Sequence, residues 1–312
     1  MSLPKQFHVP CVATMPEKDE GWQVARRKKG ANRRRKPSHP GDQTPEHSET
    51  LDLQRTKKRI TETMSELRCT DFWPEWKEQL AGILLAPGSS EAGRDLAPEA
   101  PGASVSVPGC EGGVESELEC VCYGLGSFSS CVSARYQLAM LLLLLDSLQI
   151  PVKSCSLYDP VFSSGEREIL RELGLTVLTE NEEGKRQVTR STLFYLMHCG
   201  KALYNNLLWK NWQRETLPLL TIVGNSFSGI HERMVERELQ RDYTYIAHAV
   251  SVVCEQPLPC SPRLLDVFND TALITFPPLS LDKLPPRTWE QPPEPLYQHF
   301  PDLEIIQRQQ HR

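Results

Sequence analysis

Along the second half of the chain, short β-rich apolar runs alternate with longer stretches in which apolar residues recur with helical periodicity. Strands are expected at residues 119–127, 152–163, 176–184, 192–197, 217–227 and 270–276, and helices at 133–150, 164–175, 201–212 and 230–250. Strands that alternate with helices of this length are typical of βαβ units. The pattern therefore predicts an α/β fold of Rossmann-like, doubly wound architecture with a mainly parallel sheet.

Two further helices are expected upstream of this domain. Leu53, Ile60, Met64 and Leu67 recur near helical spacing, and a second apolar stretch contains Pro74 close to its start, where proline is tolerated in a helix. Two helices of this size cannot bury a core of their own. We therefore expect them to pack on the main domain or on a partner.

Composition divides the chain into five segments. They are a disordered basic tail (1–47), a helical pre-domain segment (48–85), a disordered linker rich in Pro, Gly, Ser and Ala (86–116), the α/β domain (117–277) and a proline-rich C-terminal tail (278–312). The large apolar side chains expected to pin the C-terminal tail to the domain are Trp289, Leu296, Tyr297 and Phe300.

Basic residues are concentrated near the N-terminus. Residues 1–60 hold 14 Lys or Arg against 7 Asp or Glu, although the whole chain has a net charge of -5. The block from Arg26 to Lys36 predicts a solvated tail, which either keeps the chain soluble or contacts an import receptor. No aromatic residues are interleaved with these charges, so specific nucleic-acid recognition is not expected.

The hydrophobic pattern also indicates the compartment. The longest apolar run, from Leu138 to Leu145, is eight residues long and too short to span a bilayer. Because no apolar run follows Met1, we expect a cytoplasmic protein, with the nucleus as a second location, and no membrane association. In these compartments the cysteines are expected to be reduced thiols.

Polar residues follow four of the expected strands. In a parallel sheet, ligands bind beyond the carboxyl ends of the strands, so these residues form the candidate site. The candidates for cofactor binding are Gly124, Gly126, Ser127, Asp159, Asn225 and Ser226, and the candidates for catalysis are His198, Cys199 and Asp159. No metal-ligand spacing was recognised among the cysteines and histidines, so no metal is expected.

The glycine turn after the first strand has two interpretations. It could cradle a nucleotide or S-adenosylmethionine, or the glycines could serve only a tight turn. Ser129 stands where a dinucleotide fingerprint has its third glycine, and Asp159 lies 33 residues after Gly126, whereas about 20 is usual. Neighbours on a strand point to opposite faces, so His198 and Cys199 are not expected to pair unless the strand has already ended. We expect a neutral His198 that is hydrogen-bonded to Asp159 or Asn225 in the crevice.

Several of these motifs resemble a known family. The segments "GLGSFSS", "DPVF", "TLFYLMHCG", "LYNNLLWKNW" and "VGNSF", in this order, are similar to the SRR1 family, named for sensitivity to red light reduced. The similarity covers about residues 117–277, and "CTDFWPEW" upstream resembles the family's pre-domain helix. The family usually has Met-Pro before its His-Cys, where this chain has Leu196 and Met197.

The resemblance implies a process more than a mechanism. Family members are linked to circadian clock input, through phytochrome signalling in plants, and to haem biosynthesis and clock-gene expression in animal and fungal relatives. The expected function is therefore regulatory, through protein contacts or a small-molecule-sensing crevice. The alternative is a Rossmann-like transferase, most plausibly a methyltransferase-like enzyme that uses S-adenosylmethionine.

Overall fold

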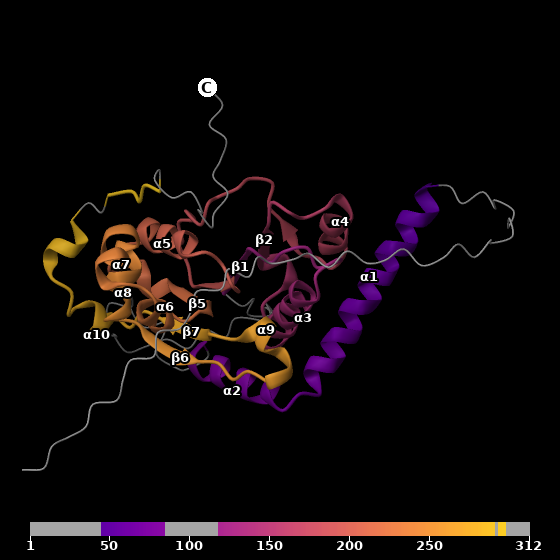
Figure 1. Ribbon diagram of the computed structural model, residues 1–312, viewed down its shortest axis with the longest axis horizontal. Helices are drawn as coiled ribbons and strands as arrows, with labels where there is room; N and C mark the ends of the chain where they lie inside the picture. Colours follow the sequence, from indigo (N-terminus) through magenta and orange to yellow (C-terminus); the bar gives the residue numbers. More distant parts are fainter. Residues whose placement is uncertain (1–44, 85–117, 291–292, 298–312) are drawn as a thin grey trace, which may run out of the picture. The chain divides into compact units, whose positions relative to one another are not determined.

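The computed structural model describes residues 45–84, 118–290 and 293–297 (Figure 1). The expected basic tail up to residue 44, including Arg26 to Lys36, the linker and Phe300 lie outside these residues. The strands are β1 (Glu119–Tyr123), β2 (Cys155–Tyr158), β3 (Thr176–Val177), β4 (Thr192–Leu196), β5 (Leu220–Asn225), β6 (Cys254–Pro257) and β7 (Thr271–Thr275). The helices are α1 (Pro45–Arg68), α2 (Phe72–Leu84), α3 (Val132–Ser147), α4 (Ser164–Glu172), α5 (Lys201–Lys210), α6 (Phe227–Arg233), α7 (Glu236–Asp242), α8 (Thr244–Val250), α9 (Leu265–Phe268) and α10 (Pro278–Leu281).

All seven strands belong to one sheet, in the order β3-β2-β1-β4-β5-β7-β6. The first five strands in this order pair in parallel, and β7 runs antiparallel to both of its neighbours. The predicted α/β class with a mainly parallel sheet is confirmed. The carboxyl ends of β1, β2, β4 and β5 therefore meet at one edge, where the candidate residues lie.

Successive strand residues enter two separate hydrophobic layers. Along β1, Cys120 and Cys122 pack with α3 on one face, whereas Val121 and Tyr123 pack with α5 on the other. Both faces of a central parallel strand are buried, which explains why these strands are apolar without polar alternation. Cys120 and Cys122 accordingly lie in the core as small apolar side chains, as free cysteines commonly do.

The two upstream helices pack on the domain, as expected. In α2, the Trp76 indole Nε1 donates a hydrogen bond to the Pro259 carbonyl at 2.7 Å, and its ring packs edge-on against Phe268. Helix α1 lies along α3, where the Tyr136 hydroxyl donates to the Glu66 carboxylate at 2.6 Å. No helix within the described ranges is both long and apolar enough to cross a bilayer.

The single helix predicted at 230–250 is wrong. The chain there forms α6, α7 and α8, with extended backbone at Met234 and Val235 and a non-helical Tyr243. A tertiary contact helps to begin α8, because the Asn205 side-chain oxygen accepts hydrogen bonds from the amides of Tyr245 and Ile246 at 3.0 and 3.3 Å. These amides belong to the first turn of α8, where backbone N–H groups have no acceptor within their own helix.

Several strands also differ from the prediction. The segment 176–184 is a strand only over β3, and the segment 217–227 only over β5. The segment 152–163 is extended only over β2, and β6 was not predicted at all. Strand β6 lies at the edge of the sheet, contains Glu255 and Gln256 and ends in Pro257. Polar and proline-containing strands of this kind are tolerated at edges, where they lack the apolar signal on which the prediction depended.

The C-terminal segment is held by two aromatic side chains. Trp289 stacks on Trp212, with ring centroids 5.7 Å apart, and Tyr297 is buried against α5. The Tyr297 hydroxyl accepts a hydrogen bond from Asn205 Nδ2 at 2.9 Å and lies 3.1 Å from the Asn206 side-chain oxygen. Leu296 is exposed, so its predicted anchoring role is wrong.

Candidate functional site

The glycine turn after β1 is shaped by a close approach to the end of β4. Gly124 has φ +66°, and a Cβ atom there would lie 2.7 Å from the Cys199 Sγ. Gly126 has φ +81°, and its amide donates to the Asp159 carboxylate at 2.7 Å. Left-handed backbone and the lack of a side chain are thus both required at Gly124.

Asp159 fastens this turn to the loop after β2. Its side chain is only 5% exposed, and its second carboxylate oxygen accepts the Val161 amide at 2.9 Å. Both carboxylate oxygens are therefore bonded to backbone amides. In a dinucleotide-binding fold, the acidic residue after the second strand binds the ribose, whereas here it holds two loops together.

Glu166 is a site residue that the sequence analysis did not identify. One carboxylate oxygen accepts from the Ser127 hydroxyl at 2.8 Å and from the Ser129 amide and hydroxyl at 2.9 Å each. The other accepts the Ser163 amide at 2.9 Å, within a capping box that begins α4. The chain thus places its own carboxylate on the serine-rich turn, where a phosphate would bind in a nucleotide site.

Burial and hydrogen bonding act in opposite directions on Glu166. Its side chain is only 1% exposed. Burial raises the pKa of the carboxyl, but the hydrogen bonds from the Ser129 and Ser163 amides and the Ser127 and Ser129 hydroxyls lower it, and the net pKa is below 4.5. Glu166 is therefore an anion at neutral pH.

His198 and Cys199 diverge at the end of β4. The strand ends at Leu196, and His198 adopts left-handed backbone with φ +52°. Its Nε2 lies 3.3 Å from the carbonyl oxygen of Asn269, so the expected hydrogen bond to Asp159 or Asn225 is wrong. The reasons are that Asp159 is already bound to two amides and that the left-handed turn directs the imidazole to the loop before β7.

The thiol of Cys199 points into the protein. Its Sγ donates to the Tyr123 carbonyl at 3.3 Å, and burial, with a smaller effect of Asp159, raises the pKa of the thiol to about 12. A thiol with this pKa is protonated at neutral pH, and the thiolate is the nucleophilic form. Cys199 and His198 thus have separate partners, but strand alternation is not the reason, because β4 has already ended at Leu196.

Asn225, the last residue of β5, and Ser226, which follows it, face different partners. Asn225 Nδ2 donates to the Cys199 carbonyl at 3.2 Å, whereas its side-chain oxygen is buried and has no hydrogen-bond partner within the described residues. The Ser226 hydroxyl donates to Glu255, whose other oxygen accepts the amides of Phe227 and Ser228 at 3.0 and 3.1 Å. A carboxylate of the chain therefore also occupies the start of α6.

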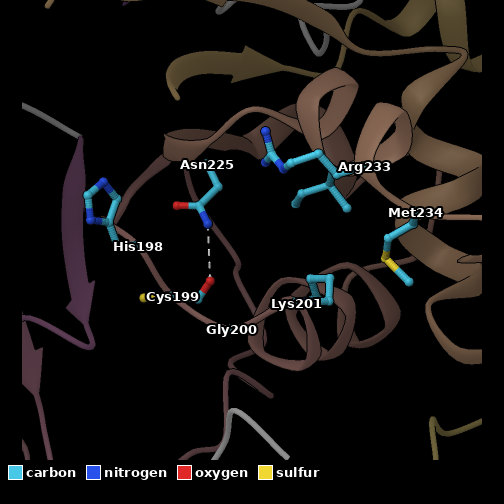
Figure 2. Close-up of a pocket in the computed structure, with 8 residues that line it drawn as sticks. His198, Cys199, Gly200, Lys201, Asn225, Arg233 and Met234 are labelled. Carbon is cyan, nitrogen blue, oxygen red and sulfur yellow. Dashed lines mark hydrogen bonds between the residues drawn. The ribbon is translucent and has the colours of Figure 1, made fainter. Parts of the chain in front are cut away.

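A pocket of about 460 Å³ opens beside β4 and β5 (Figure 2). Its lining residues are His198, Cys199, Gly200, Lys201, Asn225, Ile230, Arg233 and Met234. In Figure 2, His198 lies on one side of this pocket, with Arg233 and Met234 on the other. Of the eight candidates, the pocket gathers His198, Cys199 and Asn225, but Gly124, Gly126, Ser127, Asp159 and Ser226 do not line it.

The lining is basic. Lys201 Nζ lies 5.7 Å from the centre of the Tyr243 ring, and Arg233 forms an ion pair with Asp270. Helix α5 begins at this wall, and its N-cap Gly200 supplies no side-chain hydrogen bond. Neither Lys201 nor Arg233 was singled out in the sequence, because a single basic residue on an amphipathic helix is usually a solvated one. Within residues 45–84, 118–290 and 293–297, no group of three His, Cys, Asp or Glu is arranged to hold a metal.

The polar groups of α5 have structural partners. Asn205 caps α8, and Asn206 Nδ2 donates to the Glu183 carbonyl at 2.8 Å. Trp212, just beyond the helix, donates from Nε1 to the Thr288 carbonyl at 2.9 Å. Both amides are therefore directed into the packing of α5 against α8 and the C-terminal segment, and not into the pocket.

Comparison with known proteins identifies the family. The model of the SRR1 domain matches residues 111–275, which include the glycine turn and the pocket. The chain belongs to the SRR1 family. It is 44% identical to the SRR1-like protein of Mus musculus over 239 residues, which are 73% of this chain and 93% of the relative.

More distant relatives extend the SRR1 family across kingdoms. The SRR1-like protein of Drosophila melanogaster is 36% identical over 170 residues, covering 54% of this chain and 59% of the relative. The Arabidopsis thaliana relative, Protein SENSITIVITY TO RED LIGHT REDUCED 1, is 34% identical over 144 residues, covering 46% and 50%. The family resemblance inferred from the motifs is thereby confirmed.

Proposed function

We propose that this SRR1-family chain is a regulatory protein that senses a small molecule in the pocket beside β4 and β5. The process follows from the family: the Arabidopsis thaliana relative is named for sensitivity to red light, and the resemblance implies clock-gene expression and haem biosynthesis as the regulated processes. Signalling to protein partners in the cytoplasm or nucleus, with Arg26 to Lys36 available to an import receptor, belongs to the same proposal.

One observation carries the choice of sensing over catalysis. The backbone donors of the β1 turn are bonded to Asp159 and Glu166, while the pocket beside it has room for a ligand of several hundred cubic ångströms. This volume is within the range of ordinary small-molecule sites. The candidate nucleophile Cys199 is a protonated, inward-pointing thiol, so the pocket favours binding over covalent chemistry.

A Rossmann-like, doubly wound interpretation of the sheet is part of the proposal. The parallel strand order 3-2-1-4-5 supports it, and so does the burial of the sheet between two hydrophobic layers. The S-adenosylmethionine-dependent alternative has less support, because both oxygens of Asp159, the residue that would contact the cofactor ribose, are bonded to Gly126 and Val161.

The test blocks the pocket without assuming what it binds. Gly200 lines the pocket with φ -65° and ψ 149°, a conformation open to any residue, so Gly200→Leu adds a side chain there without backbone strain. Gly82 on α2, where an added Cβ meets nothing within 4 Å, supplies the control Gly82→Leu.

Both variants are expressed as the full chain in cells that lack the endogenous protein. The readouts are the amplitude of a clock-gene reporter and the cellular haem content, at matched protein levels. We expect Gly82→Leu to restore both as wild type does and Gly200→Leu to restore neither. Full restoration by Gly200→Leu would contradict a sensing role for the pocket and leave surface contacts as the route of regulation.

A further inference from the structure

The pocket beside β4 and β5 has a charge that its neighbouring loops lack. At the β1 turn and at the start of α6, carboxylates of the chain itself, Glu166 and Glu255, accept the backbone amides. Beside the pocket, the nearby carboxylate Asp270 is paired with Arg233. Lys201, which lies over the Tyr243 ring, and the ion-paired Arg233 both line the pocket, so its wall holds two basic side chains.

The start of α5 adds to this potential. The first-turn amides of a helix carry partial positive charge, and Gly200 provides no side chain to cap them. By contrast, α4 and α6 begin with the capping hydroxyls of Ser163 and Ser226. The pocket therefore has a built preference for an oxyanion at the wall formed by Gly200 and Lys201.

A second, independent feature indicates a hydrogen-bond donor. The Asn225 side-chain oxygen is buried without a partner in the described residues, while its Nδ2 is fixed on the Cys199 carbonyl. Turning the amide over would place two oxygens against each other, so the unpaired oxygen is not relieved by a flip. A buried acceptor without a donor costs about 1–3 kcal/mol, which a ligand's hydroxyl or amine would remove.

Backbone strain lies at the same place. His198 and Asp270 both adopt left-handed backbone, with φ +52° and +53°, and the His198 imidazole reaches the Asn269 carbonyl beside Asp270. Strained non-glycine residues cluster at ligand sites more often than elsewhere. Here they fix the His198 and Arg233 sides of the pocket relative to each other, because Asp270 holds Arg233.

We propose that the pocket binds a small metabolite that carries a phosphate or carboxylate group with a hydroxyl or amine close to it. The anionic group lies against Lys201, Arg233 and the first turn of α5, and the donor pairs with the Asn225 oxygen. This inference deepens the proposed sensing function by naming the chemical class of the ligand.

The test is calorimetry on the full chain with defined probes. Ribose 5-phosphate and gluconate carry the two candidate anions beside hydroxyls, and ribose and glucose are their neutral counterparts. We expect saturable binding of at least one anionic probe, weakened by added salt, and none of the neutral sugars. Binding of ribose 5-phosphate alone identifies a phosphate ligand, and binding of gluconate alone a carboxylate ligand.

Matched variants locate the binding. Lys201→Gln and Lys210→Gln remove lysines from opposite ends of α5, each of which lies over an aromatic ring, at 5.7 and 5.6 Å. Arg233→Gln and Arg241→Gln remove arginines of similar exposure, 57% and 63%, each in an ion pair with an aspartate. We expect about tenfold weaker binding for the first member of each pair and unchanged binding for the second.

Asn225 tests the donor half of the inference. Asn225→Leu should weaken ribose 5-phosphate about fivefold but leave inorganic sulfate unchanged, because sulfate carries no hydrogen-bond donor at neutral pH. Circular dichroism and the melting temperature establish that each variant is folded. Equal weakening in the Lys210→Gln and Arg241→Gln controls would overturn the proposal, as would binding of neutral sugars as tight as that of the anions, or no saturable binding of either anion to the folded wild type.

Failure of this inference and failure of the proposed function give different results. If Gly200→Leu abolishes regulation in cells but neither anion binds, the ligand class is wrong and sensing stands. If an anion binds through Lys201 and Arg233 but Gly200→Leu restores regulation fully, the ligand class stands and the sensing function is wrong.

Discussion

The turn after β1 and the pocket beside β4 lie at the same edge of the sheet but differ in what their polar groups bind. In the β1 turn, the amides of Gly126 and Ser129 are bonded to Asp159 and Glu166. In the pocket, the start of α5 has no side-chain cap and the Asn225 oxygen has no partner within the described residues. The amides of the β1 turn are thus bonded to carboxylates of the chain, whereas the pocket contains an uncapped helix start and an acceptor that a ligand could bind.

The difference shows that two turns at the same edge of a sheet can differ in how far the chain's own carboxylates occupy their backbone amides. Carboxylates on the β1 turn stabilise it in the way that a bound phosphate would, and their charge repels such a phosphate. The Cys199 thiol against Gly124 further fills the space between the ends of β1 and β4. Ligand binding is consequently expected not at the end of β1 but at the ends of its neighbour β4 and of β5.

The largest effect is expected from removing the carboxylate that closes the β1 turn. Glu166→Ala deletes four hydrogen bonds, and at roughly 1 kcal/mol each the free energy of unfolding should fall by about 4 kcal/mol. The measurement is chemical denaturation of the full chain. Glu168→Ala, at an exposed position on the same helix, is the control and should change it by less than about 0.5 kcal/mol. Similar values for the two variants would show that Glu166 does not hold the turn.

Substitution at the contact between Gly124 and Cys199, which joins the two regions, should lower the free energy of unfolding nearly as much. Gly124→Ala combines left-handed strain with overlap on Cys199 Sγ and should cost about 2–3 kcal/mol. Gly126→Ala has the same kind of strain but meets Ala134 only at 3.4 Å, so it should cost about 1–2 kcal/mol.

A double-mutant cycle separates the overlap from the strain. In a Cys199→Ala background, the would-be Cβ at position 124 lies 4.0 Å from the nearest remaining atom of residue 199. The cost of Gly124→Ala, measured by denaturation, should then fall to that of Gly126→Ala. An unchanged cost would mean that the thiol does not define the space between β1 and β4.

A smaller loss is expected behind the pocket, where the C-terminal segment supports α5. Tyr297→Phe removes a hydroxyl that accepts a hydrogen bond from Asn205 and donates to the Asn206 side-chain oxygen or the Ala202 carbonyl. The free energy of unfolding should fall by about 1–2 kcal/mol. The melting temperature measures this loss, and Leu296→Ala, at an exposed neighbouring position, serves as control. Equal small effects would contradict the role of Tyr297 as the anchor of this segment.

The smallest effect is a pH dependence that belongs to the β1 turn alone. The pKa of Glu166 in the folded chain is below 4.5, so its stabilisation is complete above the unfolded value and is lost as the pH falls through the folded one. The difference in unfolding free energy between wild type and Glu166→Gln should thus be constant near neutral pH and shrink below pH 4.5. A difference that grows on acidification would reverse the sign of the shift.

The sequence predicted those parts of the fold that depend on local periodicity. The apolar runs at β1, β4 and β5 and the long helix α3 are where the pattern indicated, because both faces of a central strand are buried. The helix break at Tyr243 and the edge strand β6 were not predictable in this way. Both depend on partners distant in the chain, such as Asn205 for the start of α8.

The candidate site shows the same limit more sharply. The sequence placed His198, Cys199 and Asn225 at one edge, and the structure brings them to one pocket. It could not show that Asp159 and Ser226 would be bonded to Gly126 and Glu255, because hydrogen-bond partners depend on side-chain direction. The capping box that begins with Ser163 was readable in the sequence, but the reach of Glu166 to the serine turn was not.

The most direct test of the account compares the two regions in one experiment. Backbone amide resonances of the full chain are followed by NMR while ribose 5-phosphate is added. Saturable shifts are expected at Gly200, Lys201, Ala202 and Asn225, with Gly126 and Ser129 unmoved. Shifts at Gly126 and Ser129 without change at Gly200 to Ala202 would contradict this expectation, because they would mean that the β1 turn binds the anion despite Glu166.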